Sequence, residues 1–256
     1  MSHVDAACHS GGVDKKLDRR WNHNIHYYDI ALAAAPMAST ALDVGTGDGL
    51  LAARLAENVD EVTGIDSDNE TLTNTQKNTS ADVTWIVGDV LTYPLPEAHY
   101  DLVTAVATVH HFPDLAAGLG RLARLTAPGG TLVVIGCARS STAQDYALEL
   151  VGAVQHQVLS RRRGYWQHNA PVQMDFPHTY TQVKGIATAV LPGLSWRRLP
   201  LWRYAITWRS RRRTSEHCAD KHLDNDFPVP HCLDAHRRGR TRTVGKSMRT
   251  LVRGCS

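Results

Sequence analysis

The stretch "TALDVGTGDG", residues 40–49, joins an apolar run to a segment with helical spacing. The run at 40–45 ends in glycine, which is typical of a buried strand, and residues 48–58 repeat leucine at helical intervals. Gly45, Gly47 and Gly49 would let the backbone turn sharply and let a ligand approach closely. A dinucleotide-binding fingerprint would instead have glycine where Leu50 stands. The sequence therefore predicts a strand, a ligand-binding loop and a helix.

The alternation of strand-like and helix-like segments continues along the chain. Further strands are predicted at 61–66, 82–89, 100–109 and 131–137, with helices at 68–79 and 114–126. Strands that alternate with helices indicate a mostly parallel sheet covered on both faces, an α/β fold. Outside this block we expect helices at 20–36, 143–160 and 179–192 and two late strands around 196 and at 202–208. The helix at 143–160 is amphipathic, with Leu148, Val151, Val154 and Val158 on its apolar side.

Composition excludes several classes of protein. Hydrophobic residues make up 43% of the 256 residues, which is ample for a core. No stretch of 18 apolar residues exists, so no transmembrane helix is expected, and the polar first 20 residues lack the apolar region of a secretory signal. Five cysteines do not make a disulfide framework. We therefore expect a cytoplasmic protein.

The net charge of +3 is unevenly distributed. Residues 1–209 carry 17 Lys/Arg and 20 Asp/Glu, whereas the last 47 residues carry 11 and 5. The acidic body argues against nucleic-acid binding, and the basic stretch "RRRGYW" at 161–166 is interpreted as a solvated loop. We expect a disordered leader at 1–19, one domain at 20–209 and a disordered tail at 210–256. The tail contains four possible zinc ligands, Cys218, His222, Cys232 and His236. Their spacing is not that of a familiar zinc site, so no metal site is predicted.

The glycine stretch resembles the first motif of class I S-adenosylmethionine-dependent methyltransferases. Four further landmarks follow in the family's order: Asp66 after the second strand, Asp89 in "VGDV", the stretch "YDLVTAVATVHHF" and the stretch "LTAPGGTLVV". The resemblance covers roughly residues 20–209. It is nearest to the small-molecule, quinone-biosynthesis-like branch of the family.

The resemblance implies a fold and a cofactor. The fold would be a doubly wound, mostly parallel seven-stranded sheet with a helical cover, formed by the N-terminal helix and an insertion at about 139–178. The cofactor would be S-adenosyl-L-methionine, with Asp66 on both ribose hydroxyls and Asp89 near the adenine amino group. A carboxylate can accept from two neighbouring hydroxyls at once. The resemblance implies the following cofactor-binding residues: Asp43, Gly45, Thr46, Gly47, Asp66, Ser67, Asp89, Val90 and Ala107.

Structural roles remain open for several of these residues. The alternative role of Asp43 is a cap of the glycine turn, that of Asp66 is a helix N-cap and that of Asp89 is a turn residue. His110 and His111 follow the fourth strand, where ligands bind in such folds, and either imidazole could accept a proton from the acceptor. The alternative is that they only line or orient the pocket.

The leading functional hypothesis is an enzyme that transfers a methyl group to a small-molecule acceptor by in-line displacement. A nucleic-acid methyltransferase is the first alternative. Enzymes that methylate exocyclic amines of bases carry an Asn/Asp-Pro-Pro-aromatic motif where this chain has "TVHHFP". The second alternative is a non-catalytic regulatory protein that binds S-adenosylmethionine. The sequence leaves the acceptor and the oligomeric state open.

Overall fold

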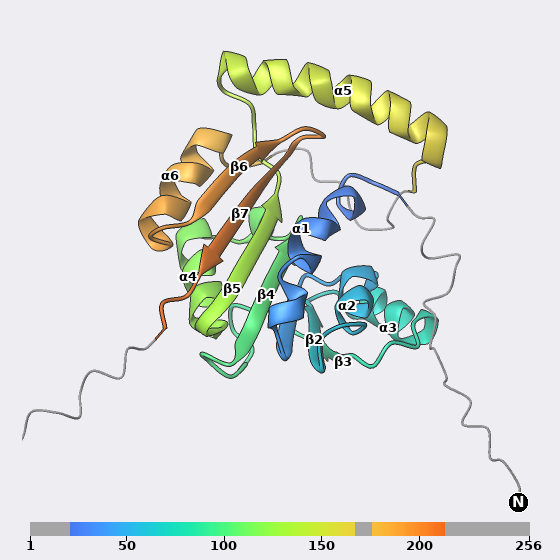
Figure 1. Cartoon of the computed structure of the whole chain (residues 1–256), viewed down its shortest axis with the longest axis vertical. Coiled ribbons are helices and arrows are strands. Elements are labelled where there is room, and N and C mark those ends of the chain that lie inside the picture. Colours follow the sequence, from blue (N-terminus) through green and yellow to red (C-terminus); the bar gives the residue numbers. More distant parts are fainter. Residues whose placement is uncertain (1–20, 167–175, 213–256) are drawn as a thin grey trace, which may run out of the picture. The chain divides into compact units, whose positions relative to one another are not determined.

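The computed structural model describes residues 21–166 and 176–212. Its centre is a seven-stranded sheet with the strand order β3-β2-β1-β4-β5-β7-β6 (Figure 1). The first five strands are parallel, whereas β7 runs antiparallel to β5 and to β6. The strand bounds are β1 Thr40–Val44, β2 Glu61–Asp66, β3 Thr84–Val87, β4 Tyr100–Val106, β5 Thr126–Gly136, β6 Ser195–Leu199 and β7 Arg203–Arg209.

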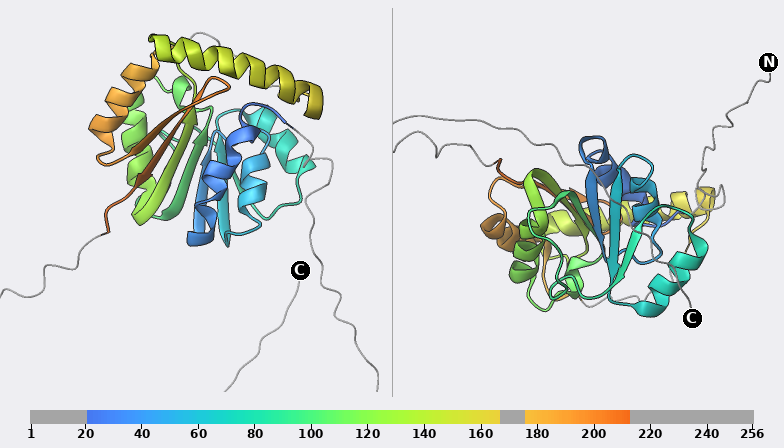
Figure 2. Two further views of the ribbon diagram at one scale, coloured as in Figure 1. Left: turned by 45° about the horizontal axis from the view of Figure 1, so that its top comes forward. Right: turned by 90° about the horizontal axis from the view of Figure 1, so that it is seen from below.

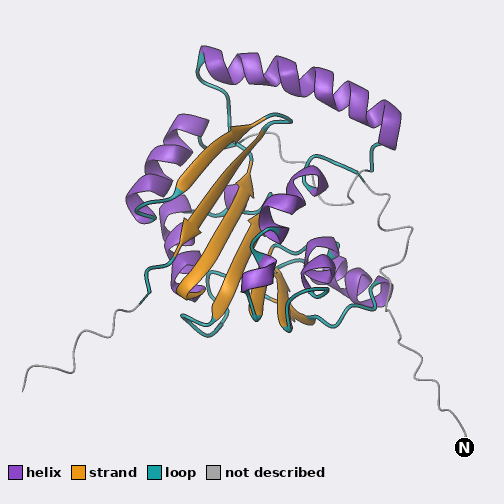
Figure 3. Cartoon of the chain, in the orientation of Figure 1, coloured by secondary structure: helices purple, strands orange, loops and turns teal. Residues whose placement is uncertain are grey.

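Helices pack on both faces of this sheet (Figures 2 and 3). Alternate strand residues point to opposite faces, so Leu42 and Val103 pack with α4 and α6, while Ala41 and Leu102 pack with α1 and α2. The resulting two apolar clusters confirm the predicted α/β class. The helix bounds are α1 Tyr28–Leu32, α2 Leu50–Leu55, α3 Asn69–Asn78, α4 Leu115–Leu125, α5 Ala143–Arg163 and α6 Tyr180–Val190; short 3-10 turns are η1 Ile25–Tyr27, η2 Ala35–Met37 and η3 Val109–His111.

The predicted helix at 20–36 is wrong in detail, because the structure divides it into η1, α1 and η2. The side chain of Asn22 accepts from the backbone N–H groups of Asn24 and Ile25, as an N-cap side chain does, and the first helical turn begins only after it, at Ile25. Pro36 restarts the backbone as a separate 3-10 turn. The fourth strand also ends earlier than predicted, at Val106, because Ala107 adopts a left-handed conformation with φ +52°.

Helix α5 is present as predicted and is three residues longer, but its apolar side does not face the core. Val151, Val154 and Val158 are exposed, while Leu148 is half-buried. The buried positions of α5 are instead Asp145 and Gly152. The helix therefore packs through its polar and small side.

The predicted leader at 1–19, nearly all of the tail and its four possible zinc ligands lie outside the described residues. Among the residues that are described, no group of three or more His, Cys, Asp or Glu side chains is arranged to hold a metal ion. Within the same residues, no helix is long and apolar enough to cross a membrane.

Candidate active site

Two loops meet where the strand order of the sheet reverses. Strand β1 has β2 on one side and β4 on the other, so the chain segments that follow β1 and β4 emerge side by side. In open α/β sheets, this carboxyl edge beside the switch point is where ligands bind. The loop after β1 contains the glycines, and the segment after β4 contains Ala107, His110 and His111.

The glycine loop needs residues without side chains. Gly45, Gly47 and Gly49 have φ angles of +65°, +54° and +69°, a region that favours glycine. A side chain at Gly45 would collide with Thr108, whereas a Cβ at Gly47 would have only the carbonyl oxygen of Gly45 near it, at 4.0 Å. The loop thus packs tightly against the β4 segment at Gly45 and leaves room above Gly47 for a ligand.

Asp43 lies beneath this loop. Its side chain is buried, and its carboxylate accepts hydrogen bonds from the hydroxyls of Thr46 at 2.8 Å and Thr104 at 2.7 Å. Burial raises the pKa of Asp43 to about 6 despite these two hydrogen bonds. Asp43 therefore braces the loop from below, joining β1 to β4 through Thr104.

Asp66 lies at the end of β2 and reaches the glycine loop. Its Oδ2 accepts from the backbone N–H of Gly47 at 2.8 Å, and its Oδ1 accepts from the N–H of Asp68 at 2.9 Å. Each carboxylate oxygen has a second lone-pair position beyond these bonds. The N-cap of α3 is Asp68, not Asp66. The helix-cap interpretation of Asp66 is therefore wrong. Ser67 is exposed and lies between Asp66 and Asp68 in the chain.

Asp89 shapes the turn after β3. Its Oδ1 accepts from the N–H of Leu91, and its carbonyl accepts from Thr92 and Tyr93. Arg121 of α4 holds the same loop, donating to the carbonyls of Val90 at 3.3 Å and of Tyr93 at 3.0 Å. Asp89 thus stabilises the turn after β3, and this role does not prevent it from also contacting a ligand.

The two histidines of η3 have different surroundings. His110 is half-buried and its Nδ1 has no hydrogen-bond partner in the described part of the chain, whereas His111 is exposed. Their ring centroids are 4.1 Å apart. Burial, and then the charges of His111 and Arg203, lower the pKa of His110 to about 4. His110 is therefore a neutral imidazole at pH 7.

His110 lines a small cavity formed in part by the residues that follow β4 and β5. The space open to the centre of a water molecule is about 10 Å³, room for about one water in this conformation. Most of its wall is apolar, and Cys137 and Tyr204 are buried there. The lining residues are Val109, His110, Phe112, Leu115, Cys137, Phe176, Pro177, His178, Val183 and Tyr204.

Comparison with known proteins assigns the family. Residues 42–134 match the family described as "Methyltransferase domain". An uncharacterized methyltransferase of Mycobacterium tuberculosis is 38% identical over 196 residues, which cover 76% of this chain and 99% of that protein. The chain belongs to the class I S-adenosylmethionine-dependent methyltransferases. The methyltransferase is therefore an enzyme that uses S-adenosylmethionine, as the sequence motifs predict.

More distant relatives agree with this assignment. The demethylmenaquinone methyltransferase of Thermus thermophilus is 36% identical over 123 residues, covering 46% of this chain and 54% of that enzyme. The ubiquinone biosynthesis O-methyltransferase of Paramagnetospirillum magneticum is 36% identical over 117 residues, covering 44% and 46%. A solved methyltransferase of Aquifex aeolicus shares the fold with a TM-score of 0.52 at 16% identity, covering 76% of this chain and 97% of that one. The match to each quinone enzyme spans about half its length or less.

The residues at this edge of the sheet fit an S-adenosylmethionine molecule. The open space above Gly47 suits a close approach, and the unused lone pairs of Asp66 suit hydroxyl donors. Sequence reasoning does not find Thr104 and Thr108, which donate to Asp43 and Val44 beside the glycine loop, or Arg121, which holds the turn after β3. Their contacts depend on which strands and helices become neighbours, and no local motif records that.

Proposed function

We propose that this methyltransferase acts on a small-molecule acceptor whose reacting end enters the cavity at His110. The observation that carries the proposal is the buried Nδ1 of His110, which has no partner within the described residues and lines an otherwise mostly apolar cavity. A buried polar atom without a partner costs free energy unless a ligand or water satisfies it. A hydroxyl or amine of the acceptor would satisfy it.

The proposed cofactor contacts come from the carboxyl ends of β1, β2, β3 and β4 and the segments that follow them. Gly45, Thr46 and Gly47 would approach the methionine part together with Ala107, and Asp43 would act by bracing the loop. Asp66 and Ser67 would bind the ribose. Asp89 and Val90 would bind the adenine.

The chemistry divides between the cofactor and the chain. When bound, S-adenosylmethionine supplies an electrophilic methyl group on a positively charged sulfonium. The chain would align the acceptor and keep water out, which suits a displacement in which charge is lost. If the acceptor loses a proton, neutral His110 is the group placed to accept it, and the resulting imidazolium would release that proton to solvent. His111 is exposed and would shape the entrance.

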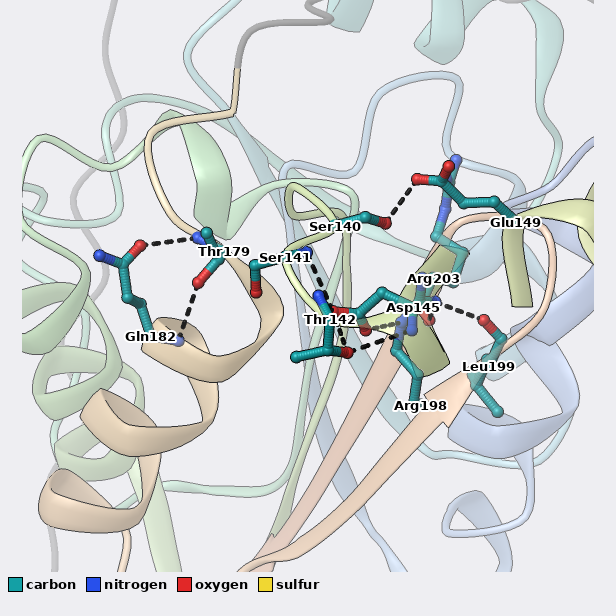
Figure 4. A network of polar contacts seen from close by, with 10 residues as sticks. All are labelled: Ser140, Ser141, Thr142, Asp145, Glu149, Thr179, Gln182, Arg198, Leu199 and Arg203. Atoms are coloured by element: carbon teal, nitrogen blue, oxygen red, sulfur yellow. Dashed lines mark hydrogen bonds and ion pairs between the residues drawn. The ribbon is translucent and has the colours of Figure 1, made fainter. Parts of the chain in front are cut away.

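Helix α5 and the N-terminal segment are the proposed cover. Two capping boxes, Thr142 with Asp145 and Thr179 with Gln182, start α5 and α6 (Figure 4). Asp145 also pairs with Arg198 of β6 at 3.3 Å, and both side chains are about nine-tenths buried. These contacts fix the beginning of α5 to the β6–β7 hairpin, which supports a cover that is anchored at this end.

Labelled methyl transfer tests the proposal. The full-length protein is incubated with methyl-labelled S-adenosylmethionine and a fractionated cell extract. Label in the small-molecule or lipid fraction is expected. Label in a nuclease-sensitive or protein fraction would contradict the proposed acceptor class. Tight cofactor binding without transfer into any fraction would favour a regulatory binding protein.

A further inference from the structure

Helix α5 presents an apolar surface to solvent. Among the described residues, eight large hydrophobic side chains are exposed, and five of them belong to this one helix. Leu150 is 72% exposed and Val154 is 66% exposed, values expected for polar residues rather than for a helix that packs on a domain. We name these five side chains the α5 apolar face: Tyr146, Leu150, Val151, Val154 and Val158.

The opposite side of α5 is fixed to the protein, so the helix cannot roll to bury this face. Asp145 pairs with Arg198, and a side chain at Gly152 would come within 2.9 Å of the backbone nitrogen of Leu201. Further along, the Nδ1 of His156 lies 2.9 Å from the Nε2 of His23. At about 100° per residue, Asp145, Gly152 and His156 share one side of the helix, and the α5 apolar face lies opposite.

The acidic and basic residues of α5 lie on different parts of the helix. Its two acidic residues point away from the apolar face, since Asp145 pairs with Arg198 and Glu149 accepts from the Ser140 hydroxyl. Its last turn carries Arg161, Arg162 and Arg163, all of which are exposed. The helix therefore offers an apolar stripe that ends in three positive charges, with neither of its carboxylates on the stripe.

We propose that α5 docks on the surface of a membrane that contains anionic lipids. An amphipathic helix with a basic region can lie at the boundary between headgroups and acyl chains, and its apolar side chains then leave water. The Arg161–Arg163 cluster would attract the phosphates of anionic lipids. Tyr146 has an apolar ring and a polar hydroxyl, which suits the same boundary.

A second copy of the chain fits this surface less well. Residues 143–158 span about 24 Å at 1.5 Å per residue. With a width of about 10 Å, two copies would bury on the order of 500 Å², well below the roughly 1,200 Å² of a standard stable interface. In an antiparallel pair the arginines would also meet no carboxylate, and in a parallel pair they would repel one another.

Vesicle sedimentation tests the proposal with the full-length protein. The vesicles are phosphatidylcholine alone or phosphatidylcholine mixed with phosphatidylglycerol. The wild-type protein should sediment with the mixed vesicles and release at high salt. Leu150→Gln with Val154→Gln should weaken partitioning at least about tenfold, because two apolar anchors are lost. Arg161→Gln with Arg162→Gln should weaken it similarly on mixed vesicles only, at about 1 kcal/mol, or about fivefold, per arginine.

Matched controls separate this face from general surface effects. Met37→Gln removes an exposed apolar side chain elsewhere (82% exposed), and Lys77→Gln with Lys184→Gln removes two exposed charges elsewhere. Both controls should sediment like the wild type. Unchanged thermal unfolding and cofactor binding would show that the α5 variants are folded.

Three results would overturn the proposal. The first is a wild type that stays in the supernatant with both vesicle types. The second is α5 variants that sediment as well as the controls, as binding through the basic tail would produce. The third is a dimer, seen by light scattering, that becomes a monomer when Leu150 and Val154 are replaced, which would make a second copy the occupant. The membrane proposal does not depend on which acceptor is methylated. Vesicle binding without labelled methyl transfer would refute only the proposed function, and labelled transfer without vesicle binding would refute only the membrane docking of α5.

Discussion

At the scale of single residues, substitution of Asp66 tests most directly whether the proposed residues bind the cofactor. Asp66→Asn keeps the shape of the side chain but removes the charge, so S-adenosylmethionine affinity should fall by about 1.5–3 kcal/mol, the usual value of a charge-assisted hydrogen bond. Asp68→Asn is the matched control, because it removes a charge two residues away and keeps an N-cap side chain. Titration calorimetry on both variants measures the effect. Equal affinities would contradict the role of Asp66.

Asp43 should make the stability of the enzyme depend on pH. Burial raises its pKa from 3.8 to about 6, so the folded state holds this proton more tightly than the unfolded state. The associated stability is present below about pH 4 and is lost as the pH rises through 6. Asp43→Asn does not titrate, so its unfolding free energy relative to wild type should increase between pH 4.5 and 7.5, by up to about 3 kcal/mol. Denaturant unfolding at several pH values measures this trend, and parallel curves would refute it.

His110 should reveal its role in the pH dependence of turnover. Because its pKa is lowered to about 4, a base at this position is already neutral at pH 5, and the rate should fall only as the pH approaches 4. His110→Ala should lower kcat by about 10²–10⁴ and abolish that decline, while His111→Ala should change it little. The measurement is a pH–rate profile with the acceptor that labelled transfer identifies. A loss confined to KM, with an unchanged profile, would leave His110 as a pocket-shaping residue.

At the scale of helices and strands, substitution of Gly152 tests whether α5 packs tightly against the β6–β7 hairpin or is only loosely attached to it. Alanine is a better helix former than glycine by up to about 1 kcal/mol. Gly185 of α6 has nothing within 4 Å of an added Cβ, so Gly185→Ala should stabilise the protein. At Gly152 the same methyl group meets the backbone of Leu201, so Gly152→Ala should be neutral or destabilising. Thermal unfolding of both variants measures the difference, and equal gains would show that α5 does not press on the hairpin.

The same scale shows which elements the sequence can predict. Strands β1, β2 and β4 and helices α3 and α4 carry their own signals, because apolar runs, an N-cap such as Asp114 and the glycine loop are local. The orientation of α5 is not local. Its valines form an apolar side that would suit a core. Instead, Asp145 pairs with Arg198 and Gly152 packs against the turn of the β6–β7 hairpin, both more than forty residues further along the chain. Tertiary contacts therefore decide which side of this helix faces inward.

The residues of the candidate site are also of two kinds: those that local motifs predict and those that depend on tertiary contacts. The glycines, Asp66 and Asp89 belong to motifs and can be named from the sequence. The difference between His110 and His111 cannot, because both are histidines in one 3-10 turn and only their burial separates them. The cavity wall is equally unpredictable, since Cys137, Phe176 and Tyr204 come from three distant segments.

At the scale of the whole molecule, the described residues supply two apolar clusters, one on each face of the sheet. Both apolar clusters draw on residues between Trp21 and Trp208, and the last strand of the sheet, β7, ends at Arg209. The match to the Mycobacterium tuberculosis relative likewise covers 76% of the chain and nearly the whole relative. The residues after 212 are basic and contain few apolar side chains.

Deleting residues 213–256 should therefore leave folding and cofactor affinity nearly unchanged, because so polar a segment buries too little apolar surface to offset its ordering entropy. We expect the melting temperature to move by less than about 4 °C, which corresponds to less than about 1 kcal/mol. Removing residues 195–256 is the contrasting truncation. It also deletes β6 and β7, with the buried side chains of Leu199, Tyr204 and Ile206, and should abolish cooperative unfolding. Calorimetry and thermal scans compare the two truncations with the full chain. A large loss of stability in the shorter deletion, or in the full chain on adding a chelator, would mean that the tail is structural and would reopen the zinc interpretation of its paired cysteines and histidines.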